Sequence, residues 1–229
     1  MGKFIVIEGT DCSGKETQSK LLVSKLTSLG KKAIRITFPN YDSPTGRIIG
    51  GPYLGKEEIS PCWFSEGAVN VDPKVACLYY AADRKYNEKE ILKYLKDDYF
   101  VICDRYISSN MAHQGSKIHD DNERFNMYQW IDKLEYWLLG LPKPDKTIFL
   151  HVPYSYAFEL KKNRISLDEH EKSEEHLKNS EVAYLELSSF YNWININCIK
   201  DKRIRDIEDI NEEIINNIKE YLWSIREFY

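Results

Sequence analysis

A glycine-bracketed loop with a lysine near the amino terminus is the strongest chemical signal in the sequence. It runs Gly-Thr-Asp-Cys-Ser-Gly-Lys-Glu-Thr from Gly9 to Thr17, directly after a short apolar run. Glycines let backbone N–H groups approach phosphate oxygens, and a helix that begins at the loop favours negative charge at its N-terminus. Lys15 is spaced to reach the β- and γ-phosphates of a nucleotide. The pattern predicts a phosphate-binding loop made of Gly9, Asp11, Cys12, Ser13, Gly14, Lys15, Glu16 and Thr17.

The residue after Lys15 departs from the usual pattern of such loops. A Ser or Thr at that position places its hydroxyl on Mg²⁺, but this chain has Glu16 there and Thr17 one residue later. A shift of one residue turns a side chain by about 100° around a helix, so Thr17 does not simply replace the missing hydroxyl. Two alternatives to an enzyme's phosphate loop stay open. One is a chance glycine turn, and the other is a nucleotide-binding protein without turnover.

Asp104 and Arg105 form a second candidate site. They follow the apolar run Tyr99–Cys103, and ligands of open α/β sheets bind at the carboxyl ends of strands. A guanidinium such as that of Arg105 suits a bidentate contact with phosphate. A structural Asp–Arg ion pair is an equal alternative on these residues alone, because such pairs also occur for purely structural reasons.

Short apolar runs alternate with helical patterns along the 229 residues, which predicts βαβ units and a mainly parallel sheet in one domain, residues 1–229. Leu22, Leu26 and Leu29 predict a helix that ends at Gly30. The region from Gly50 to Pro73 has several Gly and Pro residues and no period, so we expect a loop-rich excursion over the sheet edge. The predicted strands are Phe4–Ile7, Ala33–Phe38, Tyr99–Cys103, Thr147–Val152 and Ile194–Cys198, and a last helix carries Ile207, Ile210, Ile214 and Ile218.

The composition excludes several classes of protein. The formal net charge is -4 and no basic stripe is evident, so nucleic acid is not an expected partner. No apolar run is long enough to cross a bilayer, so a membrane is not expected either. The five cysteines have neither metal-ligand spacing nor an even number, which indicates reduced thiols and a cytoplasmic protein.

Five segments in order resemble the thymidylate kinase family of P-loop nucleoside monophosphate kinases, and the resemblance spans nearly the whole chain. The segments are the strand and loop Phe4–Gln18, the turn Phe38-Pro39-Asn40-Tyr41, the helix Tyr80-Ala81-Ala82-Asp83-Arg84, the motif Asp104-Arg105-Tyr106 with Ser109 and Asn110, and Lys161-Lys162-Asn163-Arg164 with Leu167-Asp168. The resemblance implies a P-loop fold with a five-stranded, mainly parallel sheet and a short lid at about residues 159–172.

The resemblance also implies roles for individual residues. Those for dTMP are Asp11, Phe38, Tyr41, Tyr80, Arg84, Arg105, Ser109 and Asn110, and those for catalysis are Lys15, Asp104, Arg105 and Arg164. Lys162 joins the phosphate loop in binding ATP, and Lys161 and Lys162 support the cation of Arg164. Asp104 holds Mg²⁺ through water or orients Arg105. Some family members carry Arg where this chain has Cys12, so the catalytic cation is expected from the lid. Without the resemblance, core packing explains Tyr80 better than a base-stacking role, and the adjacent Tyr79 competes for that role.

The implied reaction is transfer of the γ-phosphoryl group from ATP to dTMP with Mg²⁺, giving ADP and dTDP in a homodimeric enzyme. The alternatives are another P-loop kinase, acting on a different monophosphate or a deoxynucleoside, and a non-catalytic homologue. Glu16 is the residue that keeps the non-catalytic alternative open, because it adds negative charge beside the phosphates. A pocket that distinguishes thymine from uracil by one methyl group is worth only about 1–3 kcal/mol.

Overall fold

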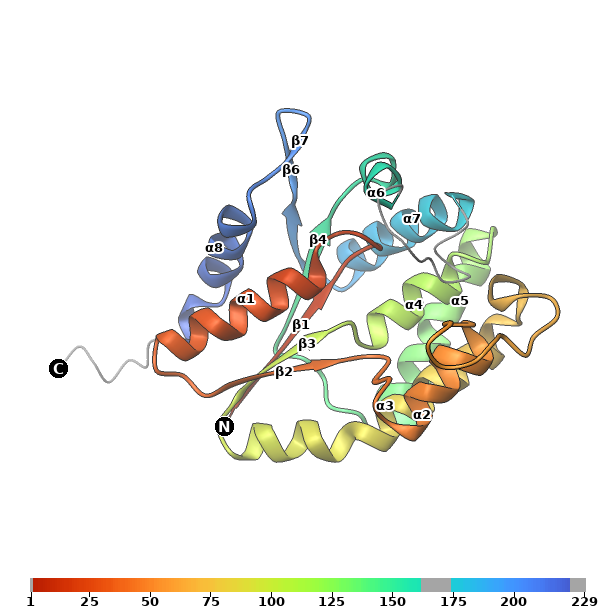
Figure 1. The fold of residues 1–229 in the computed structure, drawn as a ribbon, viewed down its shortest axis with the longest axis horizontal. Coiled ribbons are helices and arrows are strands. Elements are labelled where there is room, and N and C mark those ends of the chain that lie inside the picture. The colour runs from red at the N-terminus through yellow and green to blue at the C-terminus, as the bar shows by residue number, and fades with distance from the viewer. Residues whose placement is uncertain (1, 162–173, 223–229) are drawn as a thin grey trace.

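A computed structural model describes residues 2–161 and 174–222, without the side chain of Lys161. Its centre is a parallel sheet of five strands, as predicted, and the strands lie in the order β2-β3-β1-β4-β5 (Figure 1). The strands are β1 (Lys3–Glu8), β2 (Ala33–Thr37), β3 (Phe100–Asp104), β4 (Lys146–His151) and β5 (Ile194–Asn197). Each strand begins and ends within one residue of its predicted bounds. A short antiparallel hairpin that the sequence patterns do not predict, β6 (Ile199–Lys200) and β7 (Arg203–Ile204), follows β5.

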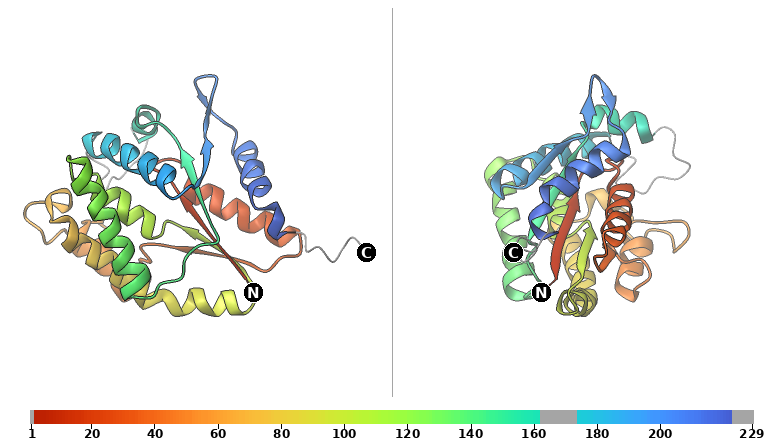
Figure 2. Two further views of the ribbon diagram at one scale, coloured as in Figure 1. Left: turned by 180° about the vertical axis from the view of Figure 1, so that it is seen from behind. Right: turned by 90° about the vertical axis from the view of Figure 1, so that its left-hand side faces the viewer.

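Helices cover both faces of the sheet (Figure 2). One face packs against α1 and α8, and the other packs against α3, α4, α5 and α7. The helices are α1 (Lys15–Ser28), α2 (Pro44–Ile48), α3 (Pro73–Lys96), α4 (Ile107–Gly115), α5 (Asp121–Asp132), α6 (Tyr154–Lys161), α7 (Glu174–Phe190) and α8 (Ile207–Asn217). Shorter π or 3-10 segments lie at Ile49–Tyr53, Ala68–Asn70, Lys133–Leu138 and Lys219–Tyr221. Within the described part of the chain, no helix has the length and apolar character needed to cross a membrane.

The apolar runs form strands because both faces of the sheet are covered. Successive side chains of a strand point to opposite faces. Phe4 and Val6 therefore enter the core beneath α3, α4, α5 and α7, whereas Ile5 and Ile7 enter the core beneath α1 and α8. All four are at most 1% exposed. A central strand of this kind needs an unbroken apolar run, and this is why β1 was visible in the sequence.

The helix ends follow local signals. Gly30 adopts a left-handed φ of 74° just after α1, which closes the helix as predicted. Leu22 and Leu26 are fully buried, but Leu29 is 45% exposed at the last turn. On the last helix Ile210 and Ile214 are buried.

The region from Gly50 to Pro73, predicted to be a loop-rich excursion, contributes buried side chains to the protein. Together with the preceding Ile49, it contributes Tyr53, Leu54, Ala68 and Val71 to a small third core, which also includes Ala76 of α3. The Tyr53 hydroxyl donates to the Ala68 carbonyl at 3.1 Å. The region therefore packs on the first half of α3, where it forms one wall of the cavity described next.

Candidate active site

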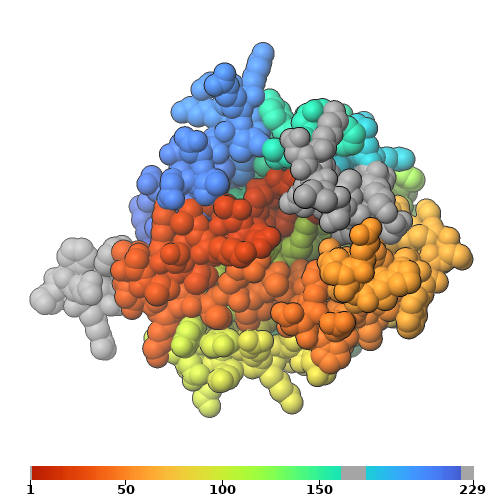
Figure 3. Space-filling view, in the orientation of Figure 1, coloured from red at the N-terminus to blue at the C-terminus, as the bar shows by residue number. Residues whose placement is uncertain are grey.

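A cavity of about 690 Å³ lies at the carboxyl ends of β1, β2 and β3. Its wall combines the loop after β1, the end of β2, the start of α4 and residues of α3 and of the 50–73 region. Figure 3 shows a hollow between the red N-terminal segment and the orange segment, with green atoms at its floor. It is larger than a cavity of about 520 Å³ beside α8 and one of about 460 Å³ at the start of β4.

The loop after β1 has the backbone that phosphate binding requires. Gly14 has a φ of 84° and Cys12 a φ of 63°, so consecutive N–H groups turn toward one side, next to the N-terminus of α1. Lys15 is 6% exposed and its Nζ donates to the Thr10 carbonyl at 2.7 Å. Burial, with a contribution from the cation of Arg105, lowers the pKa of Lys15 to about 8. An anion at this site would restore its full charge.

Glu16, the residue after Lys15, is exposed and ion-paired at the start of α1. Its carboxylate pairs with Lys20 of the next helical turn at 2.6 Å, and its side chain is 67% exposed. Glu16 and Thr17 both border the cavity. The carboxylate is thus neutralised by a neighbour on the outer face of α1, which reduces the repulsion that the sequence suggested.

Asp104 ends β3 at the cavity wall and pairs with Arg35 of β2 at 2.5 Å. Arg35 also donates from Nε to Ser19 Oγ at 2.8 Å. The sequence analysis missed Arg35, although a charged residue inside a predicted strand was the available signal. Mg²⁺ binds one or two carboxylates together with substrate phosphates and waters, and Asp104 near the phosphate loop fits such a donor set. The described residues contain no cluster of three metal-ligating side chains.

Arg105 lies at the centre of the cavity wall, with a φ of 66°. It forms an ion pair with Asp11 of the phosphate loop, and its Nη1 lies 3.2 Å from His113 Nε2. Burial disfavours the charged guanidinium, but Asp11 and the other acids nearby outweigh that effect and raise the pKa of Arg105 well above its usual value. The phosphate loop and the end of β3 are therefore joined by a permanent cation, with Asp104 paired separately to Arg35.

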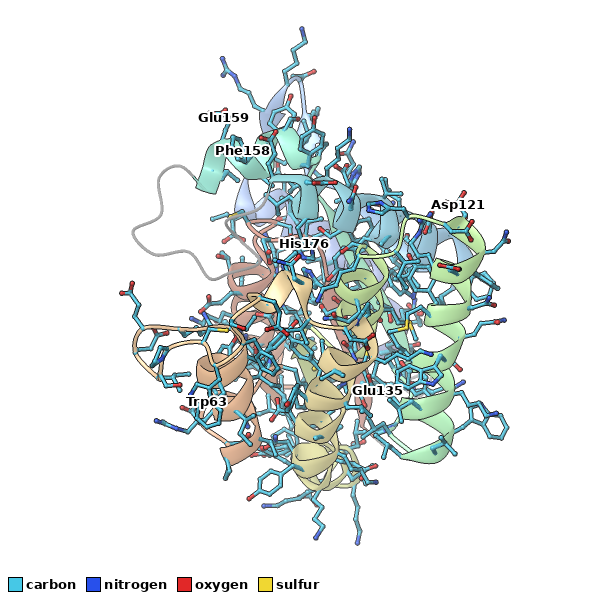
Figure 4. All side chains as sticks on the ribbon, turned by 90° about the vertical axis from the view of Figure 1, so that its right-hand side faces the viewer. Trp63, Asp121, Glu135, Phe158, Glu159 and His176 are labelled. Atoms are coloured by element: carbon cyan, nitrogen blue, oxygen red, sulfur yellow. The ribbon has the colours of Figure 1, made fainter. Side chains whose placement is uncertain are left out.

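Arg84 is held by a partner that the sequence analysis missed. Its Nε and Nη2 donate to the two carboxylate oxygens of Glu135, at 2.5 and 2.6 Å. Both side chains are buried, with exposed fractions of 2% and 0%, and Figure 4 labels Glu135. Arg84 Nη1 lies 3.4 Å from the Tyr106 carbonyl. Arg84 borders the cavity as predicted, but with a fixed orientation and part of its donors already used.

Unsatisfied amide groups lie beside this pair. Asn110 donates from Nδ2 to Glu135 at 3.0 Å, whereas its Oδ1 is buried and has no hydrogen-bond partner among the described residues. Gln114, one helical turn later, is fully buried, and both of its amide atoms lack a partner in the same part of the chain. Buried polar atoms are nearly always hydrogen-bonded. Since both side chains border the cavity, they indicate a ligand with donors and acceptors. Their i, i+4 spacing was the signal for Gln114.

Aromatic residues form the opposite wall. Tyr80 borders the cavity and packs edge-on against Tyr53, with ring centroids 5.9 Å apart. Tyr79, its neighbour and competitor in the sequence, packs against Tyr53 and Phe64. Of these two neighbours, Tyr80 is thus the one that faces the cavity.

Phe38 and Tyr41 border the cavity from the segment after β2. Phe38 is 2% exposed and packs near Tyr106, with ring centroids 5.9 Å apart. The Nζ of Lys56 lies 5.1 Å from the centroid of the Tyr41 ring. Lys56 borders the cavity too, so the 50–73 region adds a cation that the sequence analysis did not assign.

Ser109 is engaged inside the protein. Its hydroxyl donates to Glu8 at 2.6 Å and contacts the Tyr184 hydroxyl at 2.9 Å. Glu8, fully buried, also accepts from the backbone N–H groups of Tyr106 and Ser109. Burial raises the pKa of Glu8, although these hydrogen bonds oppose the shift. Ser109 and Glu8 therefore fix the start of α4 to the end of β1, and so fix Arg105.

Most residues of the predicted lid lie outside the part of the protein that the structure describes. Lys162 and Arg164 lie beyond the described residues, as do Leu167 and Asp168, and α6 ends at Lys161. The predicted roles of Lys161, Lys162 and Arg164 remain predictions.

Comparison with known proteins agrees with this arrangement. The family model described as thymidylate kinase matches residues 7–214. A thymidylate kinase of Plasmodium falciparum is 32% identical over 99% of this chain and 94% of its own length. A probable thymidylate kinase of Methanocaldococcus jannaschii is 34% identical over 94% of this chain and 95% of its own.

A solved structure supports the same conclusion for the fold. The structure of a thymidylate kinase from Candida albicans superposes with a TM-score of 0.72 and 26% identity, covering 96% of this chain and 92% of the other. The sheet order, the phosphate loop and the Asp-Arg-Tyr motif at the end of β3 are thus found in a chain that matches its relatives over nearly its full length. The chain belongs to the thymidylate kinase family, whose members are ATP-dependent nucleotide kinases.

Proposed function

We propose that this chain transfers the γ-phosphoryl group of ATP to dTMP, giving ADP and dTDP for dTTP biosynthesis. One observation carries the proposal: a single cavity contains a phosphate loop, a permanently charged arginine and two buried amides, Asn110 and Gln114, with atoms that have no hydrogen-bond partner among the described residues. A phosphoryl transfer between two nucleotides needs these parts in one place, since its catalysis is mainly positioning and electrostatic stabilisation.

Lys15 and the loop N–H groups would hold the β- and γ-phosphates of ATP. Lys15 now donates to the Thr10 carbonyl, and a phosphate oxygen would take over that donor. Mg²⁺ bound with ATP would neutralise charge on the transferring phosphoryl group. Asp104 is the residue that would hold the ion, through water, while Arg35 keeps the carboxylate in place.

Arg105 would bind the phosphate of dTMP. A dianionic phosphate is a stronger partner for a guanidinium than the single carboxylate that Asp11 offers. We therefore propose that the acceptor phosphate displaces Asp11 from Arg105, and that Asp11 then accepts a hydrogen bond from the sugar 3′-hydroxyl. Tyr41 and Lys56 lie on the same side of the cavity and would approach that phosphate.

The thymine ring would occupy the end lined by Tyr80, Phe38, Arg84, Asn110 and Gln114. Its N3–H matches the unsatisfied Oδ1 of Asn110, and its two carbonyls match N–H donors of Arg84 and Gln114. Tyr80 would stack on the ring face and Phe38 would close the edge. Ser109 would contribute by orientation, since its hydroxyl is used by Glu8.

The remaining cation for the transition state would come from the predicted lid. Cys12 cannot supply it from the phosphate loop, so we propose Arg164, supported by Lys161 and Lys162. Closure of such a segment over ATP would also exclude water and suppress hydrolysis.

Replacement of Arg105 tests the acceptor site. Arg105→Ala should raise the KM for dTMP by about a hundredfold, the effect of losing a desolvated charge-assisted contact, while the Kd for ATP changes less than about twofold. Arg47→Ala, at an exposed arginine of α2, is the matched control and should leave both constants unchanged. Equal loss of dTMP and ATP binding in Arg105→Ala would refute its assignment to the acceptor phosphate.

We further propose a cytoplasmic homodimer that pairs through α3. Val75, Leu78, Tyr86 and Leu92 are between 41% and 59% exposed and fall within an arc of about 120° of the helix, a width typical of a packing face. All five cysteines are free, which suits a reducing compartment. Light scattering should give about twice the chain mass of 27.0 kDa, and Leu78→Glu should give single chains. A wild-type mass near 27.0 kDa would contradict the dimer.

A further inference from the structure

Two histidines of the cavity region have no part in the roles above. His113 lies on α4 and His176 lies in the first turns of α7, 4% exposed and labelled in the interior in Figure 4. Their rings stack with centroids 5.4 Å apart and an interplanar angle of 20°. His113 Nδ1 and His176 Nε2 are 3.2 Å apart, within hydrogen-bond distance. Two segments far apart in the sequence thus meet through an imidazole pair beside the acceptor site.

The hydrogen bonds that this pair makes with other described residues can run in only one direction. Arg105 lies 3.2 Å from His113 Nε2, and a guanidinium only donates, so that Nε2 accepts. Neutral His113 then carries its proton on Nδ1 and donates to His176 Nε2. His176 in turn carries its proton on Nδ1, which lies 3.3 Å from Ser116 Oγ. Ser116 uses its own hydrogen on the His113 carbonyl at 2.8 Å, so its oxygen accepts.

These hydrogen bonds are compatible with one another only while both imidazoles are neutral. A protonated His113 would direct an N–H at the Arg105 guanidinium, donor against donor and cation against cation. A protonated His176 would direct an N–H at the Nδ1–H of His113. In either case Arg105 loses its bond to His113, the shortest of three contacts of Nη1, although the contacts with Ser109 at 3.4 Å and Tyr184 at 3.5 Å and the ion pair with Asp11 remain.

The charged and titratable groups that face the pair include those of three elements. Arg105 precedes α4, Asp11 and Glu8 come from β1 and the phosphate loop, and Tyr184 comes from α7. The Tyr184 ring lies edge-on to His113 with centroids 5.9 Å apart. The two acids are already bonded to Arg105 and to Ser109.

We propose that His113 and His176 position Arg105 for the acceptor phosphate, with His176 acting through His113, and that protonation of either imidazole releases this positioning. The inference rests on the proposed function, because it assigns Arg105 to the acceptor phosphate. The affected quantity is acceptor use, since the residues that hold ATP are not part of the chain of hydrogen bonds. Imidazoles titrate near pH 6.5 when unperturbed, so the effect falls on the acid side of neutrality.

Kinetics of His176 variants test the proposal. His176→Ala should raise the KM for dTMP about tenfold at about pH 8, equal to about 1.4 kcal/mol, with the KM for ATP changed less than about twofold. His176→Gln, whose amide oxygen can accept from His113 Nδ1–H, should recover most of the loss. His119→Gln, at an exposed histidine, is the control.

The pH profile separates positioning from a structural effect. The substrate phosphate also titrates below pH 7, but its contribution cancels in the ratio of wild-type to His176→Ala kcat/KM for dTMP. That ratio should fall from about ten at about pH 8 toward one as the pH is lowered and the wild-type pair gains a proton. A ratio that does not change with pH, or equal losses for dTMP and ATP, would overturn the positioning role. Should the wild type use another monophosphate, the same ratio is measured with that acceptor.

An NMR measurement keeps the inference testable apart from turnover. The ¹⁵N shifts of the imidazoles at about pH 8 should show His113 and His176 both neutral with the proton on Nδ1. A proton on Nε2 of either ring would contradict the chain, even in a protein that phosphorylates dTMP. Correct tautomers in a protein that binds no monophosphate would instead count against the proposed function alone.

Discussion

The buried pair of Arg84 and Glu135 makes a prediction whose size follows from the structure. Glu135→Gln keeps the shape of the side chain and one acceptor oxygen, but it leaves the Arg84 cation without a counter-charge at a site where the two side chains are 2% and 0% exposed. Breaking a buried pair by removing one partner costs about 3–5 kcal/mol. For a domain of this size each kcal/mol shifts Tm by about 2–4 °C, so Tm should fall by about 6–20 °C.

The control for Glu135→Gln is an exposed ion pair in the same protein. Glu208 pairs with Lys25 at 2.6 Å, but the Glu208 side chain is 64% exposed. Glu208→Gln should therefore cost less than about 1 kcal/mol. Both variants are compared with the wild type by thermal unfolding at one protein concentration. If Glu135→Gln loses no more stability than Glu208→Gln, the reasoning about the buried pair is refuted.

A double variant separates stability from recognition. Replacing both partners of a buried pair by apolar residues of similar size is often neutral or stabilising. Arg84→Met with Glu135→Leu should therefore regain most of the lost Tm while the KM for dTMP stays high, because the ring carbonyl has lost its donor. Recovery of dTMP use together with Tm would show that Arg84 supports the fold only.

Three further predictions concern Lys15, Glu16 and Lys117. The affinity for ATP should fall as pH rises above about 8, where Lys15 loses its charge, and calorimetry at about pH 8.5 should detect proton uptake on binding; an unchanged affinity up to about pH 9.5 would contradict this. Glu16→Ala should change kcat less than about threefold, because Lys20 already neutralises the carboxylate; a rise of more than tenfold would show that Glu16 opposes phosphate. Lys117→Met removes donors to the carbonyls of Ala68 and Val71, and should cost about 1–3 kcal/mol and speed proteolysis between residues 50 and 73; unchanged proteolysis would count against this contact.

The sequence was sufficient for features set by local pattern. The three central strands, β1, β3 and β4, were visible because their residues are buried on both faces. The phosphate loop was visible because glycine and lysine spacing is dictated by the ligand. Tyr80 was chosen over Tyr79 only by the family resemblance, since helical spacing does not say which of two neighbours faces a cavity. Packing of Tyr79 against Tyr53 and Phe64 settles which side each ring takes.

Features set by distant contacts could not be predicted. Glu135 meets Arg84 from 51 positions away, and neither residue's neighbours encode that pairing. His176 meets His113 across 63 positions. The i, i+4 spacing places Gln114 near Asn110, but only the structure shows that both of its amide atoms are buried without a hydrogen-bond partner among the described residues. The ion pair of Glu16 with Lys20, which reduces the expected repulsion of phosphate, is also visible only in the structure.

The central claim is that this protein phosphorylates dTMP in the cavity at the carboxyl ends of β1, β2 and β3. A measurement of turnover tests that claim most directly. ADP release from ATP and Mg²⁺ is measured with dTMP, dUMP, dCMP, dGMP, dAMP and thymidine offered separately. The range matters because the solved Candida albicans relative is described as having broad substrate specificity. We predict the highest kcat/KM with dTMP, and its selective loss in Arg105→Ala. Release strongest with another acceptor would contradict the thymine site, and no release with any acceptor while ATP or dTMP still binds would contradict the proposed catalysis.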